Sequence, residues 1–311
     1  MMNQQPVALY LVSGFLGAGK TTFLRRLLGR LSGRKTGLLV NEFGSVGIDG
    51  AMLQNGEIQL AELNNGSIFC ACMEDNLVKT LKEFSAMPIE LLLIEASGMA
   101  DPASMPAILE RLSPYLTRPY DYRGAVCLVD CTTFADYLDV LLPIQNQVAT
   151  ADLIVLNKTD LVPESQVLEI QQTIRNYNED AAVYRTTYAD VPAELIEEGL
   201  VNHGRVGRSS NTPWNRPAVY TLETTPLPVG EDAVRAFCQA VAPLTLRIKG
   251  VLETADGPLF VDGVCGQLEL SAAPEHAPAG TLVLIGKKPE YFDRELESAW
   301  EQAFHTPCPL M

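Results

Sequence analysis

A glycine-rich stretch near the start of the chain has residue types and spacing suited to binding phosphate. Residues 14–22 read Gly-Phe-Leu-Gly-Ala-Gly-Lys-Thr-Thr and match the pattern G-x-x-x-x-G-K-[ST]. Small residues let backbone N–H groups converge on phosphate oxygens at the positive end of the next helix. In this pattern Lys20 spans the β- and γ-phosphates, and the Thr21 hydroxyl holds Mg²⁺. The residues expected to hold a nucleotide are Gly14, Gly17, Ala18, Gly19, Lys20, Thr21 and Thr22.

A second polar segment, Asn157-Lys158-Thr159-Asp160, directly follows an apolar run. In GTP-binding proteins, Asn-Lys-x-Asp at this place selects guanine, because the aspartate carboxylate accepts hydrogen bonds from N1–H and the 2-amino group. Adenine does not offer this pair of donors, and a carboxylate left unpaired in the pocket penalises ATP. The alternative is an ordinary polar turn between a strand and a helix. Downstream of a phosphate loop, we interpret Asn157, Lys158 and Asp160 as guanine-binding and expect GTP or GDP as the ligand.

A carboxylate follows the apolar run at residues 91–94, in the segment Glu95-Ala96-Ser97-Gly98. A carboxylate beside a phosphate loop suits the support of Mg²⁺ or the orientation of an attacking water. Lys20 and Glu95 are therefore the expected catalytic residues. The alternative is that Glu95 caps the next helix. Ser97 and Gly98 are expected to belong to a nucleotide-sensing switch, with Gly98 allowing close approach of the chain to the γ-phosphate.

A second switch is expected after the second apolar run, at residues 41–49. Small residues alternate there with two carboxylates, and such a loop can order around Mg²⁺ and the γ-phosphate. An ordinary surface loop is the alternative. The residues expected to take part are Asn41, Glu42, Gly44 and Asp49.

Cys70 and Cys72 stand two residues apart in a polar stretch. In a bent loop, two such thiolates can bind one borderline or soft ion, such as Zn²⁺ or Co²⁺, and Glu42 or Glu74 could add an oxygen ligand. The alternative is that both are small buried side chains, as free cysteines often are. Cys127, Cys238 and Cys265 lie in apolar or structural surroundings and are expected to be core or incidental residues.

The elements that must position these motifs alternate between apolar strands and helical segments. Several of the strands are continuous Leu/Ile/Val runs, which is typical of parallel strands covered on both faces. Strands are expected at 7–12, 37–41, 91–95, 124–130, 152–157 and 181–186, and helices at 21–31, 76–84, 103–112 and 164–177. This alternation predicts an α/β fold, a P-loop NTPase with a doubly wound, mostly parallel sheet. Every motif then lies at the carboxyl end of a strand, where such folds bind ligands.

Residues 1–200 form the predicted nucleotide domain. Residues 201–217 are polar and rich in Gly and Ser and are interpreted as a linker. Residues 218–311 are predicted to form a smaller α+β domain. Its strands are expected at 218–222, 244–254, 259–261, 267–271 and 281–285, and its helices at 231–241 and 289–304.

The composition of the chain argues against some classes of binding partner and indicates a cellular compartment. The formal net charge of −15 repels nucleic acid, and no apolar run reaches the roughly 20 residues of a membrane span. The first basic residue is Lys20, so the basic region of a signal peptide is absent. Seven cysteines in a long chain fit a disulfide framework poorly. We expect a cytoplasmic protein that binds neither nucleic acid nor membrane.

Taken together, these motifs resemble the CobW-like family of metallochaperone GTPases, relatives of the nickel-insertion GTPases of hydrogenase and urease maturation. The matching segments are Gly14–Thr22, Asn41–Asp49, Glu95–Gly98 with Asp101-Pro102, and Gln147 through Leu161, and more loosely 246–250 and 284–286. The resemblance implies GTP hydrolysis coupled to delivery of a transition metal to a client metalloprotein. Of the family's Cys-x-Cys-Cys signature, only the last cysteine, Cys70, stands in place, with Cys72 close by.

The expected reaction is GTP + H₂O → GDP + phosphate. No arginine stands in an obvious finger position, so hydrolysis is expected to be slow and to be accelerated by a partner or by a homodimer. GTP-dependent ordering of residues 41–49 would then change metal affinity at Cys70 and Cys72. Two alternatives remain: a GTPase chaperone that loads a corrinoid-type cofactor into a cofactor-dependent protein, and a nucleotide-gated adaptor with no metal site.

Overall fold

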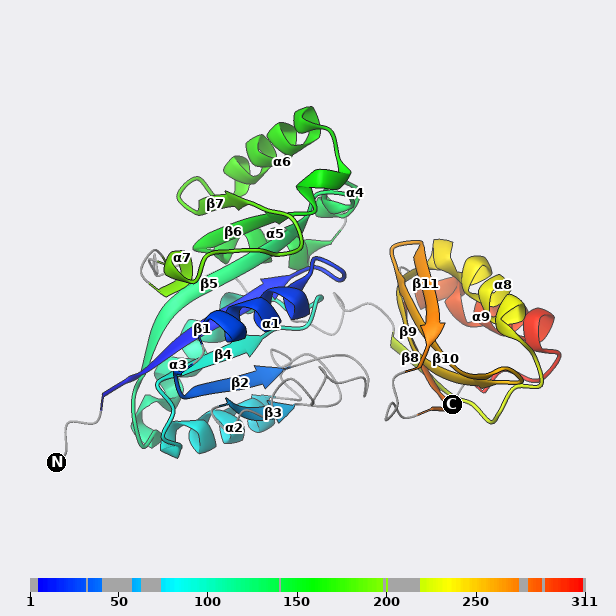
Figure 1. The fold of residues 1–311 in the computed structure, drawn as a ribbon, viewed down its shortest axis with the longest axis horizontal. Helices are drawn as coiled ribbons and strands as arrows, with labels where there is room; N and C mark the ends of the chain where they lie inside the picture. The colour runs from blue at the N-terminus through cyan, green and yellow to red at the C-terminus, as the bar shows by residue number, and fades with distance from the viewer. Residues whose placement is uncertain are drawn as a thin grey trace. The chain divides into compact units, whose positions relative to one another are not determined.

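The computed structural model describes residues 5–31, 33–40, 58–62, 74–139, 141–197, 200, 219–273, 279–286 and 289–309. The described residues fall into two compact units, one ending at residue 200 and the other beginning at residue 219 (Figure 1). The expected linker at 201–217 lies outside them, so the exact domain boundaries remain a prediction. The expected switch residues Asn41, Glu42, Gly44 and Asp49, and the expected metal ligands Cys70 and Cys72, also lie outside the described residues.

The first unit is built on a seven-stranded sheet with the order β3-β2-β4-β1-β5-β6-β7. Its strands are β1 (Val7–Gly14), β2 (Thr36–Val40), β3 (Ile58–Glu62), β4 (Leu91–Glu95), β5 (Tyr120–Asp130), β6 (Leu153–Asn157) and β7 (Ala182–Arg185). Each neighbouring pair is parallel, so the carboxyl ends of all seven strands lie along one edge of the sheet. The chain order reverses direction at β1, with β4 on one side and β5 on the other. The predicted doubly wound α/β fold is confirmed.

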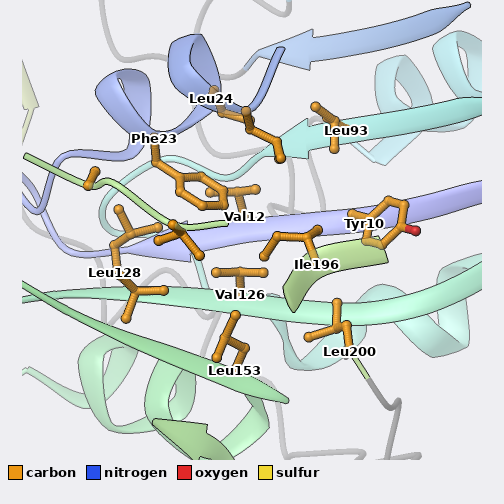
Figure 2. Packing of buried hydrophobic residues seen from close by; sticks show 14 of the residues in the cluster. Tyr10, Val12, Phe23, Leu24, Leu93, Val126, Leu128, Leu153, Ile196 and Leu200 are labelled. Carbon is orange, nitrogen blue, oxygen red and sulfur yellow. The ribbon is translucent and has the colours of Figure 1, made fainter. Parts of the chain in front are cut away.

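Helices cover both faces of this sheet. They are α1 (Lys20–Arg30), α2 (Glu74–Ala86), α3 (Met105–Leu112), α4 (Phe134–Leu138), α5 (Leu142–Thr150), α6 (Glu164–Tyr177) and α7 (Ala193–Glu197). One core cluster joins Leu9 and Leu11 of β1 to residues of α2 and α3. The other joins Tyr10 and Val12 to α1 and α7, with Phe23 and Leu24 packed over the sheet (Figure 2). Alternate residues of β1 thus pack into the two cores on opposite faces of the sheet, as expected for a strand whose side chains point alternately to either face.

The continuous apolar runs of β4 and β6 are buried at every position, as the sequence predicted. The edge strand β3 was not predicted, because its run Ile-Gln-Leu-Ala-Glu is half polar and partly exposed. Helix α5 was also missed. It is short, begins with Leu142 and Pro143, and is buried on several sides rather than along one stripe, so it lacks the helical pattern of a surface helix.

The second unit is a five-stranded antiparallel sheet with the order β11-β10-β9-β12-β8. Its strands are β8 (Val219–Glu223), β9 (Thr245–Thr254), β10 (Gly257–Val264), β11 (Gln267–Ala272) and β12 (Thr281–Gly286). The helices α8 (Glu231–Val241) and α9 (Pro289–Phe304) pack on one face, where Phe237, Trp300 and Phe304 stack against one another. The predicted smaller α+β fold is confirmed.

Candidate functional site

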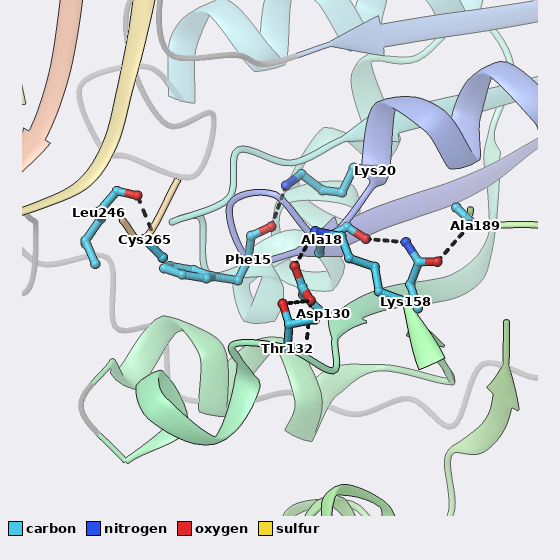
Figure 3. A network of polar contacts seen from close by, with 10 residues as sticks. Phe15, Ala18, Lys20, Asp130, Thr132, Lys158, Ala189, Leu246 and Cys265 are labelled. Carbon is cyan, nitrogen blue, oxygen red and sulfur yellow. Dashed lines mark hydrogen bonds and ion pairs between the residues drawn. The ribbon is translucent and has the colours of Figure 1, made fainter. Parts of the chain in front are cut away.

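The glycine-rich stretch forms the loop between β1 and α1. Gly14 ends β1 and Lys20 begins α1. The Lys20 ammonium donates to the backbone carbonyls of Gly14 at 2.8 Å and Phe15 at 3.1 Å, so it lies across the loop (Figure 3). Gly19 has a φ of 101°, a left-handed conformation that suits glycine, and precedes the N-terminus of the helix. The loop thus has the form that backbone binding of phosphate requires, while Thr21 and Thr22 lie half-buried in the first turn of α1.

Asn157 joins the glycine-rich loop to a loop far along the chain. It ends β6 and is 3% exposed. Its side-chain Nδ2 donates to the carbonyl of Ala18 at 2.8 Å, and its Oδ1 accepts from the N–H of Ala189 at 2.8 Å (Figure 3). A Cβ added to Gly19 would lie 2.6 Å from the same Nδ2. The Asn157 amide therefore fixes the spacing between residues 14–19 and the loop after β7.

Lys158 adopts a left-handed φ of 60°. Its ammonium lies 2.6 Å from Oδ2 of Asp130, the last residue of β5. The other oxygen of Asp130 accepts from the N–H and the hydroxyl of Thr132, at 2.9 Å and 2.6 Å (Figure 3). The sequence analysis assigned no role to Asp130. The available signal was its position, because it follows a buried strand in the same way as Glu95 and Asn157.

The segment after Asn157 is tied to the end of β7. Both the N–H and the hydroxyl of Thr159 donate to the carbonyl of Thr186, at 3.3 Å and 3.0 Å. Asp160 lies exposed in the one-turn 3₁₀ helix Thr159–Leu161. Tyr188 and Ala189, in the loop after β7, both have positive φ. Sequence reasoning missed this loop, which lies next to the Asn157–Asp160 segment.

Glu95, Ser97 and Gly98 lie at the carboxyl end of β4, next to β1. Glu95 is 5% exposed and pairs in register with Val12, two residues before Gly14. The Ser97 hydroxyl is buried and makes no hydrogen bond to the part of the chain that the structure describes. A Cβ on Gly98 would lie 2.5 Å from a methyl group of Leu16 and 2.8 Å from its backbone nitrogen. The space beside Gly98 is thus filled by the glycine-rich loop itself.

The donor set at this edge fits a nucleotide with Mg²⁺. The edge presents a loop of backbone amides at a helix N-terminus, a lysine ammonium across that loop, a threonine hydroxyl in the first turn and a buried carboxylate on the neighbouring strand. Amides and ammonium groups bind phosphate oxygens, while hydroxyl and carboxylate oxygens are the ligands that Mg²⁺ prefers. The buried Ser97 hydroxyl adds a donor beside them.

The described cysteines do not form a metal centre. Cys127 and Cys238 are buried, and burial raises the pKa of each thiol to about 12, so both are protonated at neutral pH. Within the described ranges, no three side chains of His, Cys, Asp or Glu come together in a way that could hold a metal ion. Among the same residues, no helix has the length and apolar character needed to cross a membrane.

Comparison with known proteins identifies both units. Residues 8–185 match the family model "CobW/HypB/UreG, nucleotide-binding domain", and residues 224–304 match "Cobalamin synthesis protein cobW C-terminal domain". The chain is 35% identical over 197 residues to the zinc chaperone YjiA of Escherichia coli, covering 61% of each chain. It is 34% identical over 202 residues to the zinc chaperone CobW of Sinorhizobium, covering 55% of this chain and 56% of the relative. These matches thus cover less than two thirds of the relatives' own lengths.

A solved structure is similar to this chain over most of its length. A zinc(II)-bound triple mutant of the YjiA GTPase covers 96% of this chain and 99% of its own, with 26% identity and a TM-score of 0.50. The family match over residues 8–185 spans more than half of the sequence. The chain therefore belongs to the CobW/HypB/UreG family.

Proposed function

We propose that this protein binds GTP with Mg²⁺, hydrolyses GTP to GDP and phosphate, and couples the cycle to delivery of a transition metal, zinc in the first instance, to a client metalloprotein. The observation that carries the proposal is the Asn157 amide. It bonds to Ala18 of the glycine-rich loop and to Ala189. This places the Asn-Lys-x-Asp segment beside the phosphate loop, so that one ligand carrying both a guanine base and phosphates suits the site.

The roles of the individual residues follow from their positions. The amides of residues 14–22 and the Lys20 ammonium hold the phosphates, and the Thr21 hydroxyl holds Mg²⁺. Asp160 accepts from the edge of guanine, while Lys158 is kept in place by Asp130. Glu95 supports the metal or orients water, and Ser97 and Gly98 respond to the γ-phosphate. The bound Mg²⁺ supplies charge stabilisation at the phosphates.

Zinc delivery is supported by the relatives. Those named above are zinc chaperones, and a relative in Schizosaccharomyces pombe, 31% identical over 221 residues, is named zinc-regulated GTPase metalloprotein activator 1. The buried thiols Cys127 and Cys238 are protonated and unsuited to zinc. We assign zinc binding to Cys70 and Cys72, with Glu42 adding an oxygen, because Cys70 stands in place of the last cysteine of the family's Cys-x-Cys-Cys signature.

Two measurements on the purified chain test the proposal. Calorimetric titration with GDP and ADP in the presence of Mg²⁺ is expected to show guanine binding at least about 100-fold tighter, because adenine leaves the Asp160 carboxylate unpaired. Phosphate release from GTP is expected to be slow and to disappear in Lys20→Ala. Equal affinity for the two nucleotides, or no phosphate release, would contradict the proposal.

The metal part has its own test. Zinc titration of the wild type and of Cys70→Ser/Cys72→Ser is expected to show stoichiometric binding that the double variant loses. Zinc binding that persists in the double variant would show that residues other than Cys70 and Cys72 bind the zinc. No zinc binding, with GTP hydrolysis intact, would favour the corrinoid-type loader or the nucleotide-gated adaptor.

A further inference from the structure

Helix α5 holds the chain after β4 through two neighbouring amide side chains, Asn146 and Gln147. Gln147 is 1% exposed, and its Nε2 donates to the carbonyls of Gly98 at 3.2 Å and Ala100 at 2.8 Å. Asn146 donates to Oδ2 of Asp101 at 2.7 Å. The other oxygen of Asp101 accepts from the N–H of Ala103 at 3.0 Å. We call these two amides the α5 clasp; together they fix the path of residues 98–103.

The clasped segment is in direct contact with the phosphate loop. Gly98 approaches the backbone nitrogen of Leu16 so closely that a Cβ would lie 2.8 Å from it. Ser97, with its buried hydroxyl, directly precedes the clasped segment, and Glu95 ends β4 two residues before Ser97. A shift of the Gly98 carbonyl therefore displaces Ser97 and Gly98, which the proposed function assigns to the γ-phosphate.

The clasp is also close in sequence to the strand that ends in the guanine segment. Helix α5 ends at Thr150, and β6 begins three residues later and runs to Asn157. Asn178 fixes the carboxyl end of the helix, because its Nδ2 donates to the carbonyls of Val148 at 2.7 Å and Ala151 at 2.8 Å. Buried amides thus hold helix α5 at two places, near its middle toward residues 98–101 and at its carboxyl end toward Asn178.

We propose that Asn146 and Gln147 are positioning residues for GTP hydrolysis: they hold residues 97–101 in the arrangement that meets the γ-phosphate, and they contribute little to GDP binding. The proposal rests on the proposed function and adds residues that the Glu95–Gly98 motif does not contain. The physical reason is that the proposed function assigns GDP to the phosphate loop and the guanine segment, whereas it assigns Ser97 and Gly98 to the γ-phosphate alone. Misplacing such a turn by about 1 Å can cost about 100-fold in rate.

The test compares Gln147→Met with the wild type. Methionine keeps the volume and removes both hydrogen bonds to Gly98 and Ala100. We expect GTP hydrolysis under single-turnover conditions to slow by about 10- to 100-fold. The affinity for GTPγS with Mg²⁺ is expected to fall by about 10-fold relative to the affinity for GDP, which stays within about twofold of the wild type.

Asn178→Leu is the matched control, because it removes buried amide bonds that hold the carboxyl end of the same helix and do not reach residues 98–101. It is expected to lower the melting temperature as much as Gln147→Met does, with the ratio of GTPγS to GDP affinity unchanged. Asn146→Ala, at a half-buried position, supplies a milder variant if Gln147→Met does not fold. It is expected to change the same ratio in the same direction.

The outcomes separate the clasp from the proposed function. If the wild type is active and Gln147→Met or Asn146→Ala changes neither the rate of GTP hydrolysis nor the ratio of GTPγS to GDP affinity, the clasp proposal alone is overturned. If Asn178→Leu changes the hydrolysis rate and the affinity ratio as much as Gln147→Met does, the clasp proposal is also overturned, because Asn146 and Gln147 would then contribute only to stability. A wild type that neither binds nor hydrolyses GTP overturns the proposed function, and the clasp falls with it.

Discussion

Replacing Asn157 with alanine tests how the two halves of the nucleotide site are held together. The substitution removes one bond to the Ala18 carbonyl and one to the Ala189 N–H, both at 2.8 Å between fully buried residues. Leaving a buried group without its partner costs about 1–3 kcal/mol. Taking the lower half of that range, Asn157→Ala costs about 3 kcal/mol for the two groups. At about 2–4 °C per kcal/mol, the melting temperature of the first unit is expected to fall by about 6–12 °C.

The same substitution is expected to weaken GDP binding. Without the amide, the glycine-rich loop and the loop at Ala189 are free to separate. Ligand binding must then bring the two loops back together, and the free energy that this costs is lost from the binding free energy. If half of the lost stabilisation appears in binding, about 1.4 kcal/mol, affinity falls about tenfold. Calorimetric titration with GDP and Mg²⁺ measures this directly.

The control for Asn157→Ala is Asn178→Ala, which also removes buried bonds to backbone carbonyls, at 2.7 and 2.8 Å. It is expected to lower the melting temperature to a similar extent while GDP affinity stays unchanged. If both variants weaken GDP binding equally, or if Asn157→Ala leaves GDP binding intact, the bridging role of Asn157 is refuted.

Three further predictions follow from the geometry. Gly19→Ala adds a Cβ 2.6 Å from Asn157 in a left-handed residue and is expected to weaken GDP binding more than tenfold in a titration, whereas Gly29→Ala in open space leaves it unchanged. Asp130→Asn removes the partner of the Lys158 ammonium and is expected to weaken GDP but not inorganic tripolyphosphate, measured by competition; equal weakening of both would contradict the role in base binding. Burial raises the Cys238 pKa from 9.0 to about 12, so its stabilising effect is complete below pH 9 and is lost as pH rises toward 12, by about 1.4 kcal/mol per pH unit. Urea unfolding of the second unit at pH 8 and pH 10 is expected to show this loss in the wild type and a smaller loss in Cys238→Ala.

The parts of the fold that sequence predicted well have strong local patterns. The runs of β4 and β6 are apolar at almost every position, and α6, α8 and α9 begin and end where the pattern predicts. The missed elements lack such patterns. Strand β3 is held by pairing with β2, and α5 is held by contacts on several sides; neither signal is visible in a short window of sequence.

In the candidate site too, the features with a local sequence pattern were predicted, and the contacts between distant residues were not. The glycine-rich loop is a local motif, so residue types and spacing were sufficient to predict a loop between a strand and a helix at residues 14–20. The contacts of Asp130 with Lys158, and of Gln147 with Gly98, join residues 28 and 49 positions apart. They depend on which strands become neighbours in the sheet, and the sequence contains no local sign of that choice.

The central claim is that the guanine nucleotide cycle controls zinc affinity. It is tested most directly by measuring zinc affinity in the GDP-bound and the GTPγS-bound states. The full chain is loaded with GDP or with GTPγS, each with Mg²⁺, and titrated with zinc against a chelating dye. We predict one thiol-dependent zinc site whose affinity differs at least about tenfold between the two states. Equal affinities in the two states would contradict the coupling.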